Sequence, residues 1–125
     1  MTRTKLLLVD DEEDFISALS ERLRLRNFET NVAKSGAQAL LEIERDRPDI
    51  VLLDLKMPGM DGMETLAKIK SIDPSIEVIM VTGSVDRAIG EAALRAGASG
   101  HIIKPIDIED LLDKVRELEK AHGLG

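Results

Sequence analysis

The strongest constraint on the fold of this chain is the alternation of short apolar runs with longer segments of helical periodicity. The clearest runs cover residues 6–9, 50–53, 78–81 and 102–103. Runs without polar interruption suit strands of a parallel sheet that is covered on both faces. A fifth strand is expected near residues 28–33. It is assigned to an edge of the sheet because Glu29, Thr30 and Asn31 dilute its apolar character.

Between these runs, apolar residues recur three and four positions apart, which is the spacing of amphipathic helices. Three helices follow from this pattern. They carry, in order, Ile16, Leu19 and Leu23; Val85, Ala88, Ile89, Ala92 and Ala93; and Ile108, Leu111, Leu112 and Val115.

Two further helices are predicted from capping signals. Ser35 with Gln38, and Asp61 with Glu64, have the spacing at which an N-cap side chain and the third helical residue bind each other's backbone N–H groups. The first of these helices carries Ala37, Leu40 and Leu41, and the second carries Met63, Leu66 and Ile69.

The resulting order is strand then helix, five times, which predicts an α/β fold with a doubly wound, five-stranded parallel sheet. The flavodoxin-like strand order 2-1-3-4-5 is expected. The 125 residues suit one domain, and 43% hydrophobic content supplies a core without disulfides. No linker or repeat interrupts the pattern, so residues 1–125 are interpreted as a single domain without an effector domain.

Charge and composition exclude several classes of function. The net charge of -7 gives no general attraction to nucleic acid or to anionic membranes. With no cysteine, the chain has no thiolate metal site. The first apolar run is too short for a signal peptide or a membrane span, which favours a cytoplasmic protein.

Polar residues whose side chains could take part in a reaction or bind a ligand follow the predicted strands. Asp10 and Asp11 follow the first apolar run, Asp54 the third, Thr82 the fourth and Lys104 the last. The carboxyl ends of parallel strands form the ligand crevice of such a sheet, so these side chains are expected to converge. Three carboxylates this close would raise the pKa of one of them or repel one another unless a cation neutralises them. An all-oxygen site of this kind suits Mg²⁺ or Mn²⁺.

These residues carry a family resemblance. The chain resembles the CheY-like receiver domains of response regulators in two-component signalling. The matching features are the acidic pair, Asp54 followed by the sequence MPGMDG at residues 57–62, Thr82-Gly83, the Ala-Gly-Ala turn at residues 96–98, and Lys104-Pro105. They occur in the family's order over essentially the whole chain.

The resemblance implies a role for each residue of the predicted site. It makes Asp54 the phosphoryl acceptor, Asp11 a direct metal ligand, and Asp10 a ligand directly or through water. It assigns the remaining protein ligand to the backbone carbonyl of Lys56. Phosphoryl oxygens would be held by Thr82 and Lys104, assisted by the backbone N–H of Gly83, and the Lys104-Pro105 bond would be cis.

The chain departs from the family pattern at one position and is uninformative at two. Receivers usually place Tyr or Phe on the last strand as a conformational switch, and here the residue is His101. Because a histidine changes charge near neutral pH, one hypothesis is an output that is weaker or pH-sensitive compared with an aromatic switch. The other is an exposed histidine without a role. Lys56 and Ser84 border the expected phosphoryl group, but they indicate no direction for its lifetime.

Three classes of function compete. The leading one is an interaction module controlled by phosphorylation, with a histidine kinase or histidine phosphotransfer protein as donor and a downstream protein or effector domain as target. Its docking surface, which also suits a homodimer through the last two helices and last strand, would include Arg87, Glu91, Arg95, Asp113 and Arg116. The second class is a constitutive scaffold that binds partners without phosphorylation. It is disfavoured because such a protein should have lost part of the phosphorylation site, which is complete in this sequence.

The third class is a conventional enzyme, and the sequence disfavours it. The turn after the first strand is acidic where a nucleotide-binding loop is rich in glycine, and Lys56 stands where phosphatases of the haloacid dehalogenase type have a second aspartate. Each site residue also has a simpler interpretation: Asp10 and Asp11 or Thr82 as helix caps, Asp54 as a loop residue, and Lys104 as a surface lysine.

Overall fold

The computed structural model describes residues 3–57, 59–83 and 87–121, and its centre is a five-stranded parallel sheet. The strands pair in the order β2-β1-β3-β4-β5, which confirms the predicted order and the edge position of the most polar strand. Their bounds are β1 (Lys5–Val9), β2 (Glu29–Ala33), β3 (Ile50–Asp54), β4 (Glu77–Thr82) and β5 (Gly100–Ile103).

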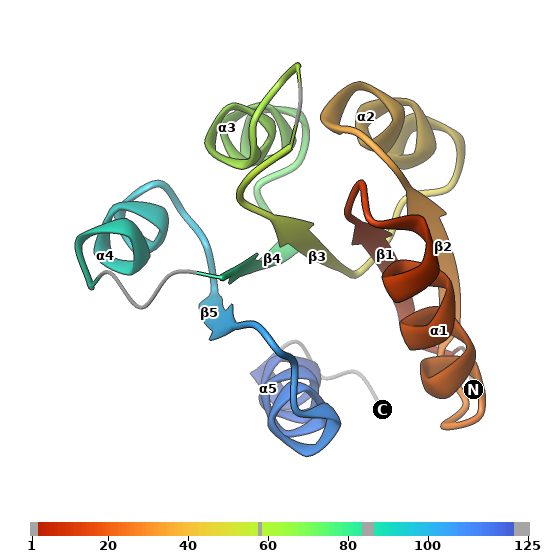
Figure 1. The fold of residues 1–125 in the computed structure, drawn as a ribbon. Coiled ribbons are helices and arrows are strands. Elements are labelled where there is room, and N and C mark those ends of the chain that lie inside the picture. The colour runs from red at the N-terminus through yellow and green to blue at the C-terminus, as the bar shows by residue number, and fades with distance from the viewer. Residues whose placement is uncertain (1–2, 58, 84–86, 122–125) are drawn as a thin grey trace.

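Five helices cover the two faces of this sheet. Figure 1 shows α1 and α5 on one face and α2, α3 and α4 on the other. The helices are α1 (Glu13–Arg24), α2 (Gly36–Arg45), α3 (Gly62–Ile72), α4 (Arg87–Arg95) and α5 (Ile108–Ala121). The predicted doubly wound α/β architecture is therefore confirmed.

The sheet divides the hydrophobic core into two clusters. In β1, Leu6 and Leu8 belong to the cluster under α1 and α5, whereas Leu7 and Val9 belong to the one under α2, α3 and α4. Successive strand side chains point to opposite faces, so a strand covered twice must be apolar at every position. This requirement explains the uninterrupted apolar runs of the sequence.

Both predicted helix caps are present. The Ser35 side chain accepts a hydrogen bond from the backbone N–H of Gln38 at 3.1 Å, and Asp61 accepts one from Glu64 at 2.9 Å. The Gln38 side chain returns a contact to the N–H of Lys34 at 2.7 Å, one residue before the expected partner. The start of α2 is thus fixed by two bonds, with a shifted partner for the second.

The buried face of α2 differs from the predicted one. Gly36, Ala39 and Ile43 are buried, whereas Ala37 is exposed and Leu41 has 67% of its surface exposed. The reason is close packing against α3: a Cβ on Gly36 would lie 2.3 Å from Thr65 Oγ1. Gly36, which has no side chain, makes the closest contact between the two helices, and a pattern based on large apolar residues does not identify it.

The predicted face of α4 is also only partly correct. Ala93 is buried as expected, but Ala88 is exposed and the second buried position is Gly90. Val85 lies outside the described residues. Among the described helices, none has the length and apolarity to cross a membrane.

The contact between α2 and α3 predicts the effect of a single methyl group. Gly36→Ala should lower the free energy of unfolding by about 1–3 kcal/mol, because the new Cβ overpacks against Thr65. Leu41→Ala in the same helix should change it by less than about 0.5 kcal/mol, since that side chain is exposed. Urea unfolding followed by far-UV circular dichroism measures both, and equal midpoints for Gly36→Ala and wild type would contradict the packing argument.

Candidate functional site

The candidate site lies where four neighbouring strands end. Asp10 follows β1, Asp54 and Thr82 are the last residues of β3 and β4, and Lys104 follows β5. Parallel pairing aligns these ends, since Asp54 pairs with Val81. The backbone N–H of Lys104 also donates to the Thr82 carbonyl at 2.7 Å. The predicted convergence of distant polar residues is therefore a consequence of strand order and register.

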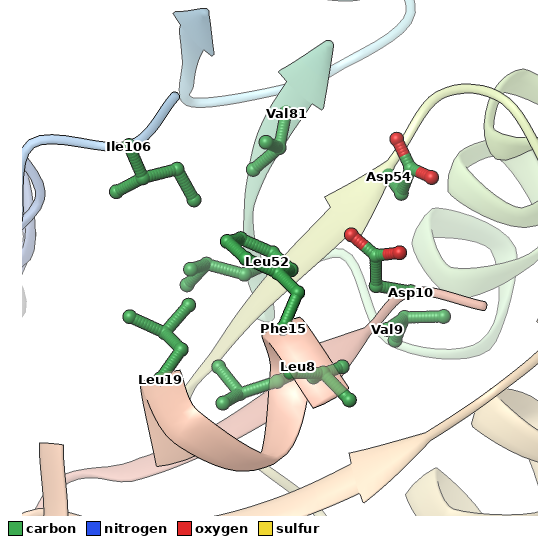
Figure 2. A pocket seen from close by; sticks show the side chains of 10 residues that line it. Leu8, Val9, Asp10, Phe15, Leu19, Leu52, Asp54, Val81 and Ile106 are labelled. Atoms are coloured by element: carbon green, nitrogen blue, oxygen red, sulfur yellow. The ribbon is translucent and has the colours of Figure 1, made fainter. Parts of the chain in front are cut away.

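Three carboxylates gather at this edge. Asp10, Asp11 and Asp54 each present one oxygen, and these oxygens lie within 4.8 Å of one another. Asp10 is 3% exposed and Asp54 is 6% exposed, whereas Asp11 faces solvent. Figure 2 shows the Asp10 and Asp54 carboxyl groups at the ends of adjacent strands, beside an apolar pocket lined by Leu8, Leu52 and Val81.

Lys104 supplies the positive charge inside this cluster. Its Nζ donates to Asp10 Oδ2 at 2.8 Å and to Glu12 Oε1 at 3.1 Å, and it lies 3.8 Å from Asp54 Oδ1. The same ammonium sits over the Phe15 ring, 4.9 Å from its centroid. Burial lowers the pKa of Lys104, but the hydrogen bonds to Asp10 and Glu12 outweigh it and leave the pKa above its usual value.

The Asp54 carboxyl is electrostatically strained. Burial, followed by the negative charge of Asp10, raises the pKa of Asp54 to about 6, while Lys104 and the backbone of Lys56 oppose that rise. The charged form of a carboxyl is disfavoured by desolvation and by like charges. A further cation beside Asp54 would therefore stabilise the carboxylate form.

The donor set fits a hard divalent cation. All three side chains offer carboxylate oxygen, which Mg²⁺ and Mn²⁺ prefer. Lys56 lies in the loop two residues after Asp54, with its side chain exposed and its backbone close enough to lower the pKa of Asp54 through a hydrogen bond. Burial and the charge of Asp10 raise the pKa of Asp54 despite the nearby Lys104, so a further positive charge at this site would stabilise the carboxylate.

The simpler interpretation of the acidic pair as a helix cap finds little support. The N-cap of α1 is Glu12, and no side chain caps it. Asp10 Oδ1 accepts a hydrogen bond from the backbone N–H of Glu12 at 2.9 Å, which orders the loop before the helix. The other Asp10 oxygen faces Lys104, so the residue serves both the loop and the charged cluster.

Close backbone packing shapes the loop that follows Asp54. A Cβ on Gly62, at the start of α3, would lie 2.5 Å from the Asp54 carbonyl oxygen and 2.6 Å from Leu55 Cα. Gly59 has a φ of 78°, a conformation that glycine adopts without strain. The glycines of the MPGMDG motif thus allow α3 to pack directly against the backbone of Asp54. Pro58 lies outside the described residues.

The remaining residues of the predicted site are placed less completely. Thr82 is 2% exposed at the end of β4, and Gly83 after it is exposed. The Lys104-Pro105 peptide is cis, as the resemblance implies. Ser84 lies outside the described residues, so its influence on the lifetime of a phosphoryl group stays a prediction.

His101 occupies a tight position between β5 and α4. Its Nε2 is buried, without a hydrogen-bond partner among the described residues. A Cβ on Gly90 would lie 2.9 Å from His101 Nδ1, so the imidazole lies against the bare backbone of α4. His101 is therefore partly buried in a helix contact, which excludes a freely exposed histidine.

Three residues near these features had no role in the sequence analysis. Phe15 and Glu12 contact the Lys104 ammonium, and Gly90 receives the His101 ring. Phe15 fits the apolar periodicity of α1, one position before Ile16, and such spacing gives no sign of a charged neighbour. Gly90 interrupts an otherwise alanine-rich helix, which is the one signal that could have marked it.

Comparison with known proteins gives a consistent family match. The model of the family described as the response regulator receiver domain matches residues 6–116. Sporulation initiation phosphotransferase F of Bacillus subtilis is 38% identical over 117 residues, covering 94% of both chains. Transcriptional regulatory protein PrrA of Mycobacterium tuberculosis is 34% identical, and the chain spans about half of its length, 53%.

Solved structures agree with this match. A CheY-like response regulator receiver domain protein from Methanospirillum hungatei superposes with a TM-score of 0.91 at 31% identity, over 99% of this chain and 100% of that one. A receiver domain protein from Clostridium thermocellum gives a TM-score of 0.90 at 29% identity, over 96% of this chain and 97% of that one.

The raised pKa of Asp54 predicts how stability depends on pH without a metal. A carboxyl whose pKa is higher in the folded than in the unfolded state destabilises the fold over the pH range between the two pKa values. For Asp54 this range runs from 3.8, the usual pKa, to about 6, the pKa in the folded protein. At pH 7 in EDTA, Asp54→Asn should therefore exceed wild type in free energy of unfolding by about 1–2 kcal/mol, an amount reduced by solvent screening. Urea titrations between pH 4.5 and 7.5 test this.

A partly buried carboxyl outside the site provides the control with the opposite sign. Hydrogen bonds from Ser75, followed by the charge of Arg47, hold the pKa of Asp73 below its usual value. Its contribution to stability is present above pH 4 and is lost at lower pH, so Asp73→Asn should weaken the fold at pH 7. Parallel pH profiles for wild type and Asp54→Asn would contradict the assignment of strain to Asp54.

Proposed function

Because the chain belongs to the response regulator receiver domain family, whose members are phosphoacceptors of two-component signalling, we propose that its acceptor residue is Asp54. The observation that carries this proposal is the cluster itself. Carboxylate oxygens of Asp10, Asp11 and Asp54 lie within 4.8 Å of one another, and the Lys104 ammonium is 3.8 Å from Asp54. Among the described carboxylates, Asp54 alone combines burial, a raised pKa and this cationic neighbour.

The metal site is part of the same proposal. Asp10, Asp11 and Asp54, with the backbone carbonyl of Lys56, would hold one Mg²⁺ or Mn²⁺ ion. When bound, the ion would neutralise charge on the equatorial oxygens of the phosphoryl group. The exposure of Asp11 leaves the cluster open on the solvent side, where a phosphodonor would approach.

The chain's own residues would act by position and charge. One Asp54 carboxylate oxygen attacks the phosphorus of a phosphohistidine, the P–N bond breaks, and the imidazole leaves with the bonding electron pair. Lys104 would stabilise the transferred oxygens by charge, and the Thr82 hydroxyl would donate to one of them at the end of β4. Such transfer requires positioning more than acid-base chemistry, which suits a site without a general base.

The proposed output is a change in the surface formed by α4, β5 and α5. Thr82 ends β4 beside Lys104, and His101 lies two residues before Ile103, the β5 residue that pairs with Thr82. A shift of Thr82 toward a phosphoryl group would therefore affect the strand that carries His101. The five charged residues predicted for the docking surface are all exposed on α4 and α5, where a partner or a second copy can reach them.

The partners follow from the family. A histidine kinase or a histidine phosphotransfer protein would donate the phosphoryl group, and a downstream protein or effector domain would receive the signal. One relative matched over nearly its full length is named a phosphotransferase, which supports a place in a phosphorelay. The absence of an effector domain, a homodimer through α4, β5 and α5, and a cytoplasmic location stay predictions, as does the pH sensitivity of His101.

No specific observation favours the constitutive scaffold. The side chains that phosphorylation requires are present and the carboxylates are assembled, whereas a scaffold has no need of this strained cluster. Receiver domains are phosphoacceptors rather than conventional enzymes. The proposed reaction accordingly ends on the protein itself.

Phosphorylation by a small donor tests the acceptor assignment. Incubation with acetyl phosphate and Mg²⁺ should add one phosphoryl group to the intact mass of the wild-type protein. Asp54→Asn should gain none, and wild type in EDTA should gain far less. Mass spectrometry is the suitable readout because the chain has no Trp. Equal labelling of wild type and Asp54→Asn would move the acceptor to another residue.

The contact between Gly90 and His101 predicts a coupled pair. Gly90→Ala places a Cβ 2.9 Å from the imidazole, and should lower the free energy of unfolding by about 1 kcal/mol or more. In a His101→Ala background the same change should be neutral or stabilising, since alanine favours the helix. Urea unfolding of the four proteins in this double-mutant cycle gives the coupling energy. Additive effects would show that the two residues do not restrict each other.

A further inference from the structure

The Lys104 ammonium has a contact that the proposed phosphorylation chemistry does not use. We propose that Phe15 is a positioning residue that keeps Lys104 beside Asp54 when the Asp10 carboxylate is occupied by a metal ion. The inference rests on the proposed function, because it concerns the same lysine and the same cation site. Its basis is the position of the ammonium over the Phe15 ring, 4.9 Å from the centroid.

The need for such a residue follows from the way Lys104 is held. Its shortest contact is with Asp10 at 2.8 Å, whereas Asp54 at 3.8 Å lies beyond hydrogen-bond distance. Asp10 is also a proposed metal ligand, and each of its oxygens already accepts a hydrogen bond, from Glu12 N–H and from Lys104. A divalent cation at Asp10 would compete with the ammonium for this carboxylate and repel it.

The Phe15 ring attracts the ammonium independently of those carboxylates. The negative face of an aromatic ring binds a cation electrostatically, and the attraction strengthens where water is partly excluded. The Lys104 side chain is only 20% exposed. The ring contact therefore persists when Asp10 is occupied, and it favours the position from which Lys104 reaches Asp54.

The ring itself is firmly placed. Phe15 lies in the first turn of α1 and packs, half-buried, against the core cluster under α1 and α5. It lines the pocket that also contains Asp10 and Asp54, together with Leu19, Leu52 and Ile106, as Figure 2 shows. Phe15 thus forms the boundary between the apolar core and the charged cluster.

Glu12 is a weaker alternative for the same task. It accepts a hydrogen bond from Lys104 at 3.1 Å, but its side chain is 65% exposed. Exposed ion pairs are screened by solvent and contribute little to holding a side chain in one position. A fixed, half-buried ring holds the ammonium in place more effectively than a mobile surface carboxylate.

A comparison of four variants tests the inference by kinetics. With acetyl phosphate and saturating Mg²⁺, Phe15→Leu should phosphorylate about three- to tenfold more slowly than wild type, the effect expected from loss of one cation–π contact. Phe15→Tyr, which keeps the ring, should restore the rate to within about twofold. In a Lys104→Ala background, Phe15→Leu should have no further effect, because the residue acts only through the lysine.

Phe28 provides the matched control for packing. It is the second of two phenylalanines in the chain and is also half-buried against the same core cluster. Phe28→Leu should lower stability without changing the rate of phosphorylation. Equal rate losses in Phe15→Leu, Phe15→Tyr and Phe28→Leu would assign the effect to general packing and overturn the inference.

Nuclear magnetic resonance provides a readout that does not depend on phosphorylation. In protein with ¹³C-labelled lysine, the ε-methylene protons of Lys104 should be shifted upfield by the Phe15 ring, both in EDTA and with Mg²⁺. The shift should disappear in Phe15→Leu and remain in Phe28→Leu. Loss of the shift on addition of Mg²⁺ would show that the contact belongs to the metal-free form only, and would overturn the inference.

The outcomes for the inference and for the proposed function are distinguishable. If wild type is phosphorylated and Lys104→Ala is slow, a normal rate for Phe15→Leu rejects the positioning role of Phe15 and leaves the proposed function intact. If wild type gains no phosphoryl group, the proposed function fails, and the Lys104 resonance in Mg²⁺ still decides whether Phe15 holds the lysine.

Discussion

The site depends on a concentration of negative charge at the buried end of a parallel sheet. The central strands β1 and β3 are adjacent, so Asp10 and Asp54 emerge side by side where water is largely excluded. Neither carboxylate can be moved away without changing the strand order. The structure instead brings Lys104 from the far end of the chain to the same edge, and it packs the start of α3 against the Asp54 backbone to fix the loop beyond it.

The sequence was sufficient for the architecture because the strands are covered on both faces. Double coverage demands apolarity at every strand position, and this leaves a run that cannot be mistaken for a half-exposed helix. Once the strands are placed, the carboxyl-end rule brings Asp10, Asp54, Thr82 and Lys104 together without reference to side-chain detail. The fold and the identity of the cluster could therefore be predicted, while the distances within it could not.

The errors and omissions have a common physical origin in small residues and in residues with two roles. The apolar spacing of α2 predicts that Leu41 is buried, but Gly36 makes the contact with α3 and leaves Leu41 in solvent. Gly90 similarly receives His101 at a place where periodicity expects a side chain. The contact of Phe15 with Lys104 cannot be predicted for another reason. A core residue that also contacts an ammonium has the same sequence pattern as one that does not.

The charges of the cluster explain why the proposed cation and phosphoryl sites depend on each other. Three carboxylates and one ammonium leave two net negative charges around Asp54 at pH 7, which repel an incoming phosphoryl group. Lys104 alone cannot reverse this balance, because one positive charge faces three carboxylates, and its shortest contact is with Asp10 rather than with Asp54. Whatever occupies Asp10 therefore decides how much of the lysine's charge is available to Asp54. Among the described residues, Lys104 is the cation that contacts the acidic cluster directly. Under the proposed function it would become a ligand for phosphoryl oxygens once another cation took its place at Asp10, and the Phe15 ring would keep it close.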